Sequence, residues 1–224
     1  MLDKSFSMLS ENEQNAVFNE QLQPKGKPIL FLDLETTGLS AATAAPIELA
    51  AVVCSGPCHG WTFHSKMRPF VGAIIDQRAL DANGYNCREI MTWPDPSEVF
   101  QNFQDWINGV WKSDDAVLEG GYNYHFDRQF LIEFCVRYQA HAAWYGNTFA
   151  TNFIEVRKEL KEAFPQHNPY GRGQPGKLKE QYYLHFNEVL EKAHTAGADV
   201  AGTMRLFLHA DKHKQEPKYT HLYD

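Results

Sequence analysis

The segment of residues 29–38 constrains the fold of this chain most, because an apolar run ends there in two carboxylates and a Thr-Thr-Gly turn. The run predicts a buried strand, and Asp33 and Glu35 lie two residues apart at its end. Successive side chains alternate between the faces of a strand, so both carboxylates share one face, about 6.5 Å apart. Because hard divalent cations prefer carboxylate oxygens, the pair predicts half of a metal site, with a solvated turn as the alternative.

Length and composition place the chain among compact α/β proteins. Its 224 residues suit one domain or at most two small ones, and no apolar run approaches the roughly 20 residues that span a bilayer. Residues 1–23 are polar and acidic, without the apolar core of a signal peptide, so we expect neither export nor membrane association. These features together predict a cytoplasmic location.

The cysteine pattern favours free thiols. The four cysteines are Cys54, Cys58, Cys87 and Cys135. Cys54 and Cys58 are spaced as Cys-x3-Cys with His59 and His64 nearby, which would suit half of a zinc site, but no second pair follows at finger spacing. We therefore expect reduced cysteines in a reducing compartment rather than zinc ligands or a disulfide.

The charge balance limits the kinds of partner. With 21 basic and 28 acidic side chains the formal net charge is -7, which argues against a protein that coats DNA non-specifically. It does not exclude an enzyme that holds a few phosphates through bound metal ions, because such ions supply the local positive charge.

The order of the predicted elements indicates the fold class. Hydrophobic periodicity predicts strands over residues 29–34, 46–53, 61–67 and 116–118. It predicts helices over residues 74–82, 96–111 with Ser97 as N-cap, 127–138, 150–163, 178–186 and 196–210. A hairpin followed by alternating helices and strands predicts an α/β fold with a mixed β-sheet flanked by α-helices. The expected division is a leader (1–24), a domain (25–210) containing a long loop (164–176), and an extended tail (211–224).

Two further acids lie where they can meet the first pair. Asp127 follows the strand predicted at 116–118 and lies where a loop enters a helix, so capping of that helix is the alternative to a metal role. Asp199 lies in a strongly apolar helix, where a lone carboxylate is unusual unless it is paired or binds a metal. His194, five residues earlier, has the chemistry of a general base.

Three motifs resemble those of the DEDD superfamily of 3′-to-5′ exonucleases, which contains the proofreading subunit of bacterial DNA polymerase. Asp33-Leu34-Glu35-Thr36-Thr37-Gly38 is similar to its first motif, Asn123-Tyr124-His125-Phe126-Asp127 to its second, and His194-Thr195-Ala196-Gly197-Ala198-Asp199 to its third. The histidine in the third motif is typical of the DEDDh branch. The resemblance spans residues 29–210 and implies a ribonuclease H-like fold.

By this resemblance, the expected activity is metal-dependent release of nucleoside 5′-monophosphates from the 3′ end of nucleic acid, with single-stranded DNA as the favoured substrate. The implied metal ligands for two Mg²⁺ or Mn²⁺ ions are Asp33, Glu35, Asp127 and Asp199. The implied general base is His194. The implied contacts to the terminal nucleotide come from Thr36, Thr37, Gly38, Leu39 and Asn123.

Departures from the family pattern leave the substrate open. Tyr122 stands where the family often has histidine, and Ala150-Thr151 replaces an expected Asp-Thr. The alternatives are an exoribonuclease or oligoribonuclease of the same branch, a proofreading subunit docked on a polymerase through the termini, and a non-enzymatic nucleic-acid-binding domain. The sequence does not indicate the oligomeric state.

A basic stretch is a candidate for phosphate contacts. Its members are Arg157, Lys158, Arg172, Lys177 and Lys179. A solvated charged face is the alternative, because four glutamates are interspersed: Glu155, Glu159, Glu162 and Glu180.

Overall fold

One five-stranded sheet forms the centre of the computed structural model, which describes residues 28–54, 60–111, 116–138, 142–167 and 176–215. The strands are β1 (Ile29–Thr36), β2 (Pro46–Cys54), β3 (Thr62–Lys66), β4 (Val117–Gly121) and β5 (Phe149–Glu155), in the order β3-β2-β1-β4-β5. Strand β1 is central, antiparallel to β2 and parallel to β4. The predicted mixed sheet with an antiparallel and a parallel side is therefore confirmed.

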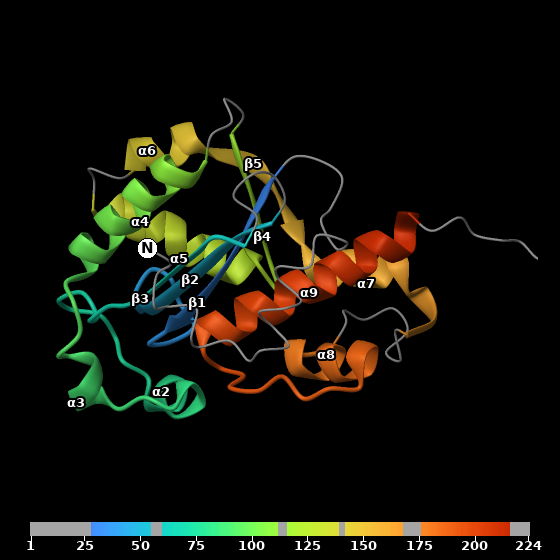
Figure 1. The fold of residues 1–224 in the computed structure, drawn as a ribbon. Helices are drawn as coiled ribbons and strands as arrows, with labels where there is room; N and C mark the ends of the chain where they lie inside the picture. The colour runs from blue at the N-terminus through green and yellow to red at the C-terminus, as the bar shows by residue number, and fades with distance from the viewer. Residues whose placement is uncertain (1–27, 55–59, 112–115, 139–141, 168–175, 216–224) are drawn as a thin grey trace, which may run out of the picture.

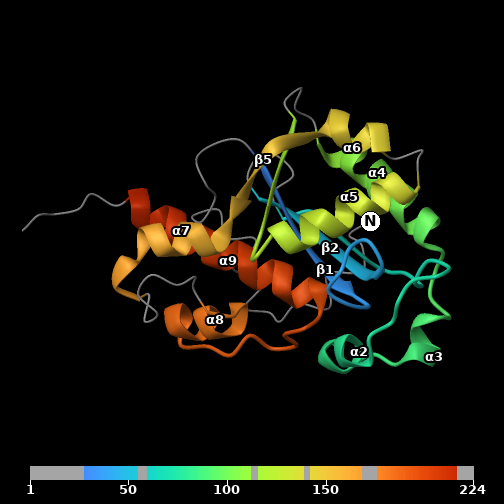
Figure 2. The ribbon, with the colours of Figure 1, turned by 180° about the vertical axis from the view of Figure 1, so that it is seen from behind.

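Helices cover both faces of this sheet (Figure 1). On one side lie α4 (Pro96–Val110), α5 (His125–Arg137) and α6 (Ala142–Thr148). On the other lie α7 (Val156–Ala163) and α9 (Ala196–Gln215), with α8 (Leu178–Phe186) outside α9, as the reverse view also shows (Figure 2). The short helices α2 (Gln77–Asn83) and α3 (Cys87–Ile90) follow β3, and the amide of Asn83 in α2 donates to the carbonyl of Thr36 at the end of β1.

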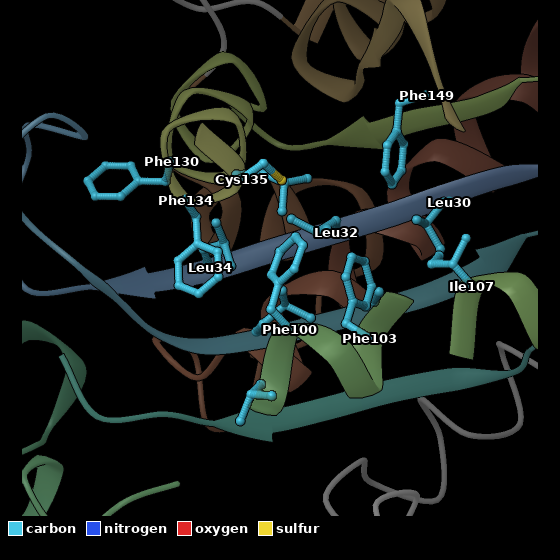
Figure 3. Close-up of a cluster of buried hydrophobic side chains, with 14 of the residues drawn as sticks. Leu30, Leu32, Leu34, Phe100, Phe103, Ile107, Phe130, Phe134, Cys135 and Phe149 are labelled. Carbon is cyan, nitrogen blue, oxygen red and sulfur yellow. The ribbon is translucent and has the colours of Figure 1, made fainter. Parts of the chain in front are cut away.

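Alternation along β1 divides the core into two layers. Leu30, Leu32 and Leu34 point toward α4 and α5, where they pack against a cluster of aromatic and aliphatic side chains (Figure 3). Phe31 points the opposite way and meets Phe207 of α9, with ring centroids 5.1 Å apart. Since side chains on a strand alternate faces, Asp33 and Glu35 must lie on the α9 side with Phe31.

Several predicted boundaries are wrong. Asp95, not Ser97, caps α4, because Pro96 occupies the first helical position and the Asp95 carboxylate accepts the N–H of Ser97 at 2.9 Å. The helix predicted over 150–163 is instead β5 followed by α7, because the aromatic and β-branched residues of 149–154 pair with β4. Strand β4 runs to Gly121, beyond the predicted 116–118. Helices α3 and α6 were not predicted.

The extended conformation predicted for the tail is wrong where the tail is described, since residues 211–215 continue α9. Lys214 bonds Glu159 of α7 at 2.7 Å, which anchors this last turn. Residues 1–27, 55–59 with their predicted turn, 216–224 and residues 168–175 of the predicted loop lie outside the described parts of the chain. Cys54, Cys87 and Cys135 are free thiols, whereas Cys58 and His59 are among the residues not described.

A helix that spans a membrane must combine length with apolar character. None of the helices in the ranges given above is both long and apolar enough to cross a bilayer.

Strand β4 approaches its neighbours so closely that Gly121 tolerates no side chain. A Cβ there would lie 2.4 Å from Cδ2 of Tyr124 and 3.0 Å from the carbonyl oxygen of Leu32. We expect Gly121→Ala to lower the free energy of unfolding by about 1–3 kcal/mol, the usual cost of overpacking, in urea denaturation. Gly109→Ala is the matched control, because nothing lies within 4 Å of its Cβ position in α4 and alanine there should stabilise by up to about 1 kcal/mol. Equal effects of the two variants would contradict this assignment.

Candidate active site at the end of the central strand

Two carboxylates project from β1 toward the start of α9. Asp33 and Glu35 lie on the same face, as predicted, and Glu35 is only 9% exposed. Asp199 lies in the first turn of α9. One oxygen each from Asp33, Glu35 and Asp199 lies within 4.8 Å of the other two, and we call these three residues the carboxylate cluster. The alternative of a solvated turn at Asp33 and Glu35 is therefore wrong.

Asp127 reaches the same region from the opposite side of the sheet. It is the third residue of α5 and is 4% exposed. Its Oδ1 accepts the N–H of Leu34 at 3.0 Å, which ties α5 to β1 between the two cluster acids of that strand. The capping alternative is wrong, because the N-cap position is Tyr124 and Asp127 lies three residues after it.

Burial and mutual repulsion shift the ionisation of these acids. Burial, followed by the charges of Asp127 and Asp199, raises the pKa of Asp33 well above its ordinary value. Burial raises the pKa of Glu35 to about 8, with Asp199 adding to the shift. Burial likewise raises the pKa of Asp127 to about 8, although the Leu34 N–H opposes it. A divalent cation among these oxygens would relieve both the desolvation and the repulsion, so the donor set fits a hard metal ion.

These shifts predict how the metal-free protein responds to pH. Glu35 and Asp127 bind protons more tightly when folded than when unfolded, so the free energy of unfolding should fall as pH rises from about 4 to about 8. Thermal melts in a chelator should show this slope, and Mg²⁺ or Mn²⁺ should reduce it because a cation keeps the acids ionised at low cost.

Variants of single acids separate this effect from other titrations. Glu35→Gln should flatten the slope in chelator, whereas Glu133→Gln on the exposed side of α5 should leave it unchanged. A wild-type slope that is the same with and without metal would count against the metal assignment.

A fifth acid, Glu48, was not among the predicted site residues. It lies on β2 directly opposite Glu35 and is fully buried. Its Oε1 lies 2.6 Å from Nε2 of His64, and its Oε2 accepts the hydroxyl of Tyr85. The sequence signal for Glu48 was an acid inside the apolar run at 46–53, because a carboxylate is buried in such a strand only when it has hydrogen-bonding partners.

Hydrogen bonds from the Thr-Thr-Gly segment hold the loop that follows Glu35. The hydroxyl of Thr36 donates to the carbonyl of Gly38 at 2.7 Å. The hydroxyl of Thr37 donates to the carbonyl of Ile74 at 2.8 Å and accepts the N–H of Ala45, so it is used within the protein. Leu39 is 86% exposed and is the apolar residue of this segment that remains open to a ligand.

Asn123 and His194 both adopt left-handed backbone conformations, with φ of 60° and 72°. The Oδ1 of Asn123 accepts Nη1 of Arg157 at 2.9 Å, so this side chain braces the loop before α5. The N–H of His194 donates to Oδ2 of Asp199 at 3.2 Å, which places the histidine loop beside the carboxylate cluster. Burial, then Lys179 and Lys177, lowers the pKa of His194, so its imidazole is neutral near pH 7 and able to accept a proton.

Comparison with known proteins agrees with this geometry. A family model described as an exonuclease, RNase_T, matches residues 30–207. Ribonuclease T of Baumannia cicadellinicola is 31% identical over 113 residues, covering 46% of this chain and 51% of that protein. Ribonuclease T of Klebsiella pneumoniae is 40% identical over 62 residues, covering 25% and 29%. The chain thus matches about half or less of these relatives' length.

Solved structures support the fold. Exonuclease I of E. coli, in complex with a dT13 oligonucleotide, matches with a TM-score of 0.62 at 18% identity, covering 82% of this chain and 41% of that one. Exonuclease I of Methylocaldum szegediense matches with a TM-score of 0.63 at 16% identity, covering 86% and 42%. The predicted ribonuclease H-like fold is therefore confirmed.

Proposed function

Because this chain belongs to the exonuclease family, we propose that it removes nucleotides one at a time from the 3′ end of nucleic acid. The reaction is hydrolysis of the terminal phosphodiester, and the product is a nucleoside 5′-monophosphate. The observation that carries the proposal is the carboxylate cluster, in which Asp33, Glu35 and Asp199 bring oxygens within 4.8 Å of one another. Such a cluster beside a neutral histidine suits metal-assisted phosphodiester hydrolysis.

The carboxylate cluster, together with Asp127, would hold two Mg²⁺ or Mn²⁺ ions. The Leu34 N–H holds the Asp127 carboxylate at the end of β1, where it can contribute an oxygen to a cation. When bound, divalent cations lower the pKa of water and offset charge on the phosphoryl group. His194 takes the proton of the attacking water. The 36–39 segment holds the terminal nucleotide, with Leu39 against its base.

Single-stranded DNA is the substrate we favour, and RNA is the second candidate. Solved Exonuclease I relatives were complexed with dT13 and dA16 oligonucleotides, whereas the curated relatives of higher identity are named Ribonuclease T. The sugar is distinguished by contacts to its 2′-hydroxyl, which depend on pocket geometry. A binding domain without activity has less support, because all four acids and His194 are present. Docking on a polymerase, the cytoplasmic location and the domain division at 24 and 210 stay predictions.

A substrate panel tests this proposal. Single-stranded DNA, duplex DNA with a mismatched 3′ end, RNA and dinucleotides, each labelled at the 5′ end, should be incubated with Mg²⁺ or Mn²⁺. We expect a ladder of products shortened from the 3′ end, fastest on single-stranded DNA and absent with a chelator. Internal cuts, shortening from the 5′ end, or activity in chelator would each overturn the proposal.

A further inference from the structure

Three cations lie beside the candidate active site on the side of α7 and α8. Arg157 is the second residue of α7 and donates to Oδ1 of Asn123 at 2.9 Å, four residues before Asp127. Its guanidinium also lies 5.8 Å from the ring centroid of Tyr122. The charge of Arg157 is therefore held at the loop that leads into the second acidic motif.

Lys177 and Lys179 reach the same place from the start of α8. The hydroxyl of Tyr122 donates to the carbonyl of Gly176, which fixes the beginning of α8 against the end of β4. Both lysines are exposed. Arg157, Lys177 and Lys179, which we call the cationic shelf, thus lie around Tyr122 and Asn123, at the loop that leads into Asp127.

Two of the interspersed glutamates lie at this shelf, but their carboxylates are engaged by backbone N–H groups. Glu155 accepts the backbone N–H groups of Asn123 and Tyr124, and Glu180 accepts that of Lys177. Farther along α7, Glu159 and Glu162 bond Lys214 of α9.

Lys158 belongs to that second, solvated group. Its Nζ lies 3.9 Å from Glu162, and its side chain is exposed. The basic stretch therefore divides into a shelf at the site and a charged face elsewhere. Arg172 lies outside the described residues.

We propose that Arg157, Lys177 and Lys179 bind the phosphates on the 5′ side of the scissile bond, so that one strand runs from the carboxylate cluster across the starts of α7 and α8. This inference rests on the proposed function and names the surface through which the same site receives its substrate. The ligand of the shelf is a phosphodiester chain of either DNA or RNA, because cations contact the backbone without reading the base. The shelf explains how a chain of net charge -7 attracts a polyanion.

The test compares chain lengths. A dinucleotide such as dTdT has one phosphate, the scissile one, whereas dT10 has further phosphates on the 5′ side. For Arg157→Gln and for Lys177→Gln/Lys179→Gln, we expect kcat/KM on dT10 to fall by about tenfold, mostly through KM, and the value on dTdT to change far less. The dependence of log KM on log salt should also become shallower, by about 0.7 for each phosphate of a single strand that the variant no longer neutralises.

Controls separate charge from structure. Arg157→Lys should restore part of the loss, and Lys158→Gln, which removes the same charge one residue away, should match the wild type. Binding of fluorescent dT10 by anisotropy in Ca²⁺ provides a readout independent of turnover. An equal loss of kcat/KM on both substrates would overturn the proposed role of the shelf in binding phosphates. An unchanged salt dependence and dT10 affinity in the variants would do the same. A wild type that binds dT10 through these residues without hydrolysing it would instead overturn the proposed activity.

Discussion

Asp33→Asn is expected to lower metal-dependent hydrolysis by about 10³-fold or more while the fold is kept. The side chain belongs to the carboxylate cluster, so its loss removes a metal ligand, and bound cations supply several kcal/mol of transition-state stabilisation. Asparagine preserves the shape but removes a charge that Asp127, Asp199 and Glu35 repel. The metal-free variant should therefore melt at a higher temperature than the metal-free wild type at pH 8.

The measurement is single-turnover hydrolysis of single-stranded DNA in saturating Mn²⁺, with thermal melts in chelator beside it. Asp105→Asn on the exposed face of α4 is the matched control and should behave as the wild type in both assays. Hydrolysis that persists at the wild-type rate in Asp33→Asn would rule out the cluster as the metal centre. A lower melting temperature in chelator would contradict the repulsion that burial and neighbouring acids imply.

His194→Ala is expected to slow hydrolysis by about 10²–10⁴-fold, the usual contribution of a general base. The backbone N–H of His194 donates to the third motif acid, Asp199, and the lowered pKa of its imidazole keeps the ring neutral at pH 7. In the wild type the rate should fall as pH drops below the pKa of this histidine, because the protonated ring cannot accept a proton from water. The variant should lose that acid limb as well as the rate.

Rate profiles between pH 5 and 9 at saturating metal distinguish this role from a structural one. His167→Ala is the control, because that exposed ring lies against Phe164 at the far end of α7. Metal affinity of His194→Ala, measured by calorimetry, should stay near the wild-type value, since the histidine is not a member of the cluster. A slow variant that keeps the wild-type pH profile would assign the proton transfer to another group.

Local sequence patterns were sufficient to predict the first half of the site, Asp33 and Glu35. The apolar run before Asp33 predicts a buried strand, and the period of two places Glu35 on the same face without any tertiary information. The apolar surroundings of Asp199 likewise mark it as an acid that needs a partner. Helix α4 was predicted from its apolar stripe. Its cap was assigned to Ser97 instead of Asp95, because both residue types are favoured N-caps and the two lie only two residues apart.

Other features depend on pairing between distant segments. Strand β5 is defined by its hydrogen bonds to β4, and without that partner the pattern of residues 150–155 predicts a helix. Glu48 joins the site because β2 pairs with β1 in a register that sets it opposite Glu35. The hydroxyl of Thr37 is used by Ile74 and Ala45, which no local pattern indicates.

Strand and helix periodicity, together with the three motifs, predicted the side chains to which we assign the chemistry, because periodicity assigns each residue to a face over a few positions. The distances between these side chains and their charges come instead from tertiary packing. Packing of α5 and α9 on opposite faces of the sheet brings Asp127 and Asp199 to the end of β1, where burial and repulsion raise the pKa values of the acids there. Helix geometry turns Arg157 and Lys158 about 100° apart, and packing then sets Arg157 against Asn123 while Lys158 faces Glu162.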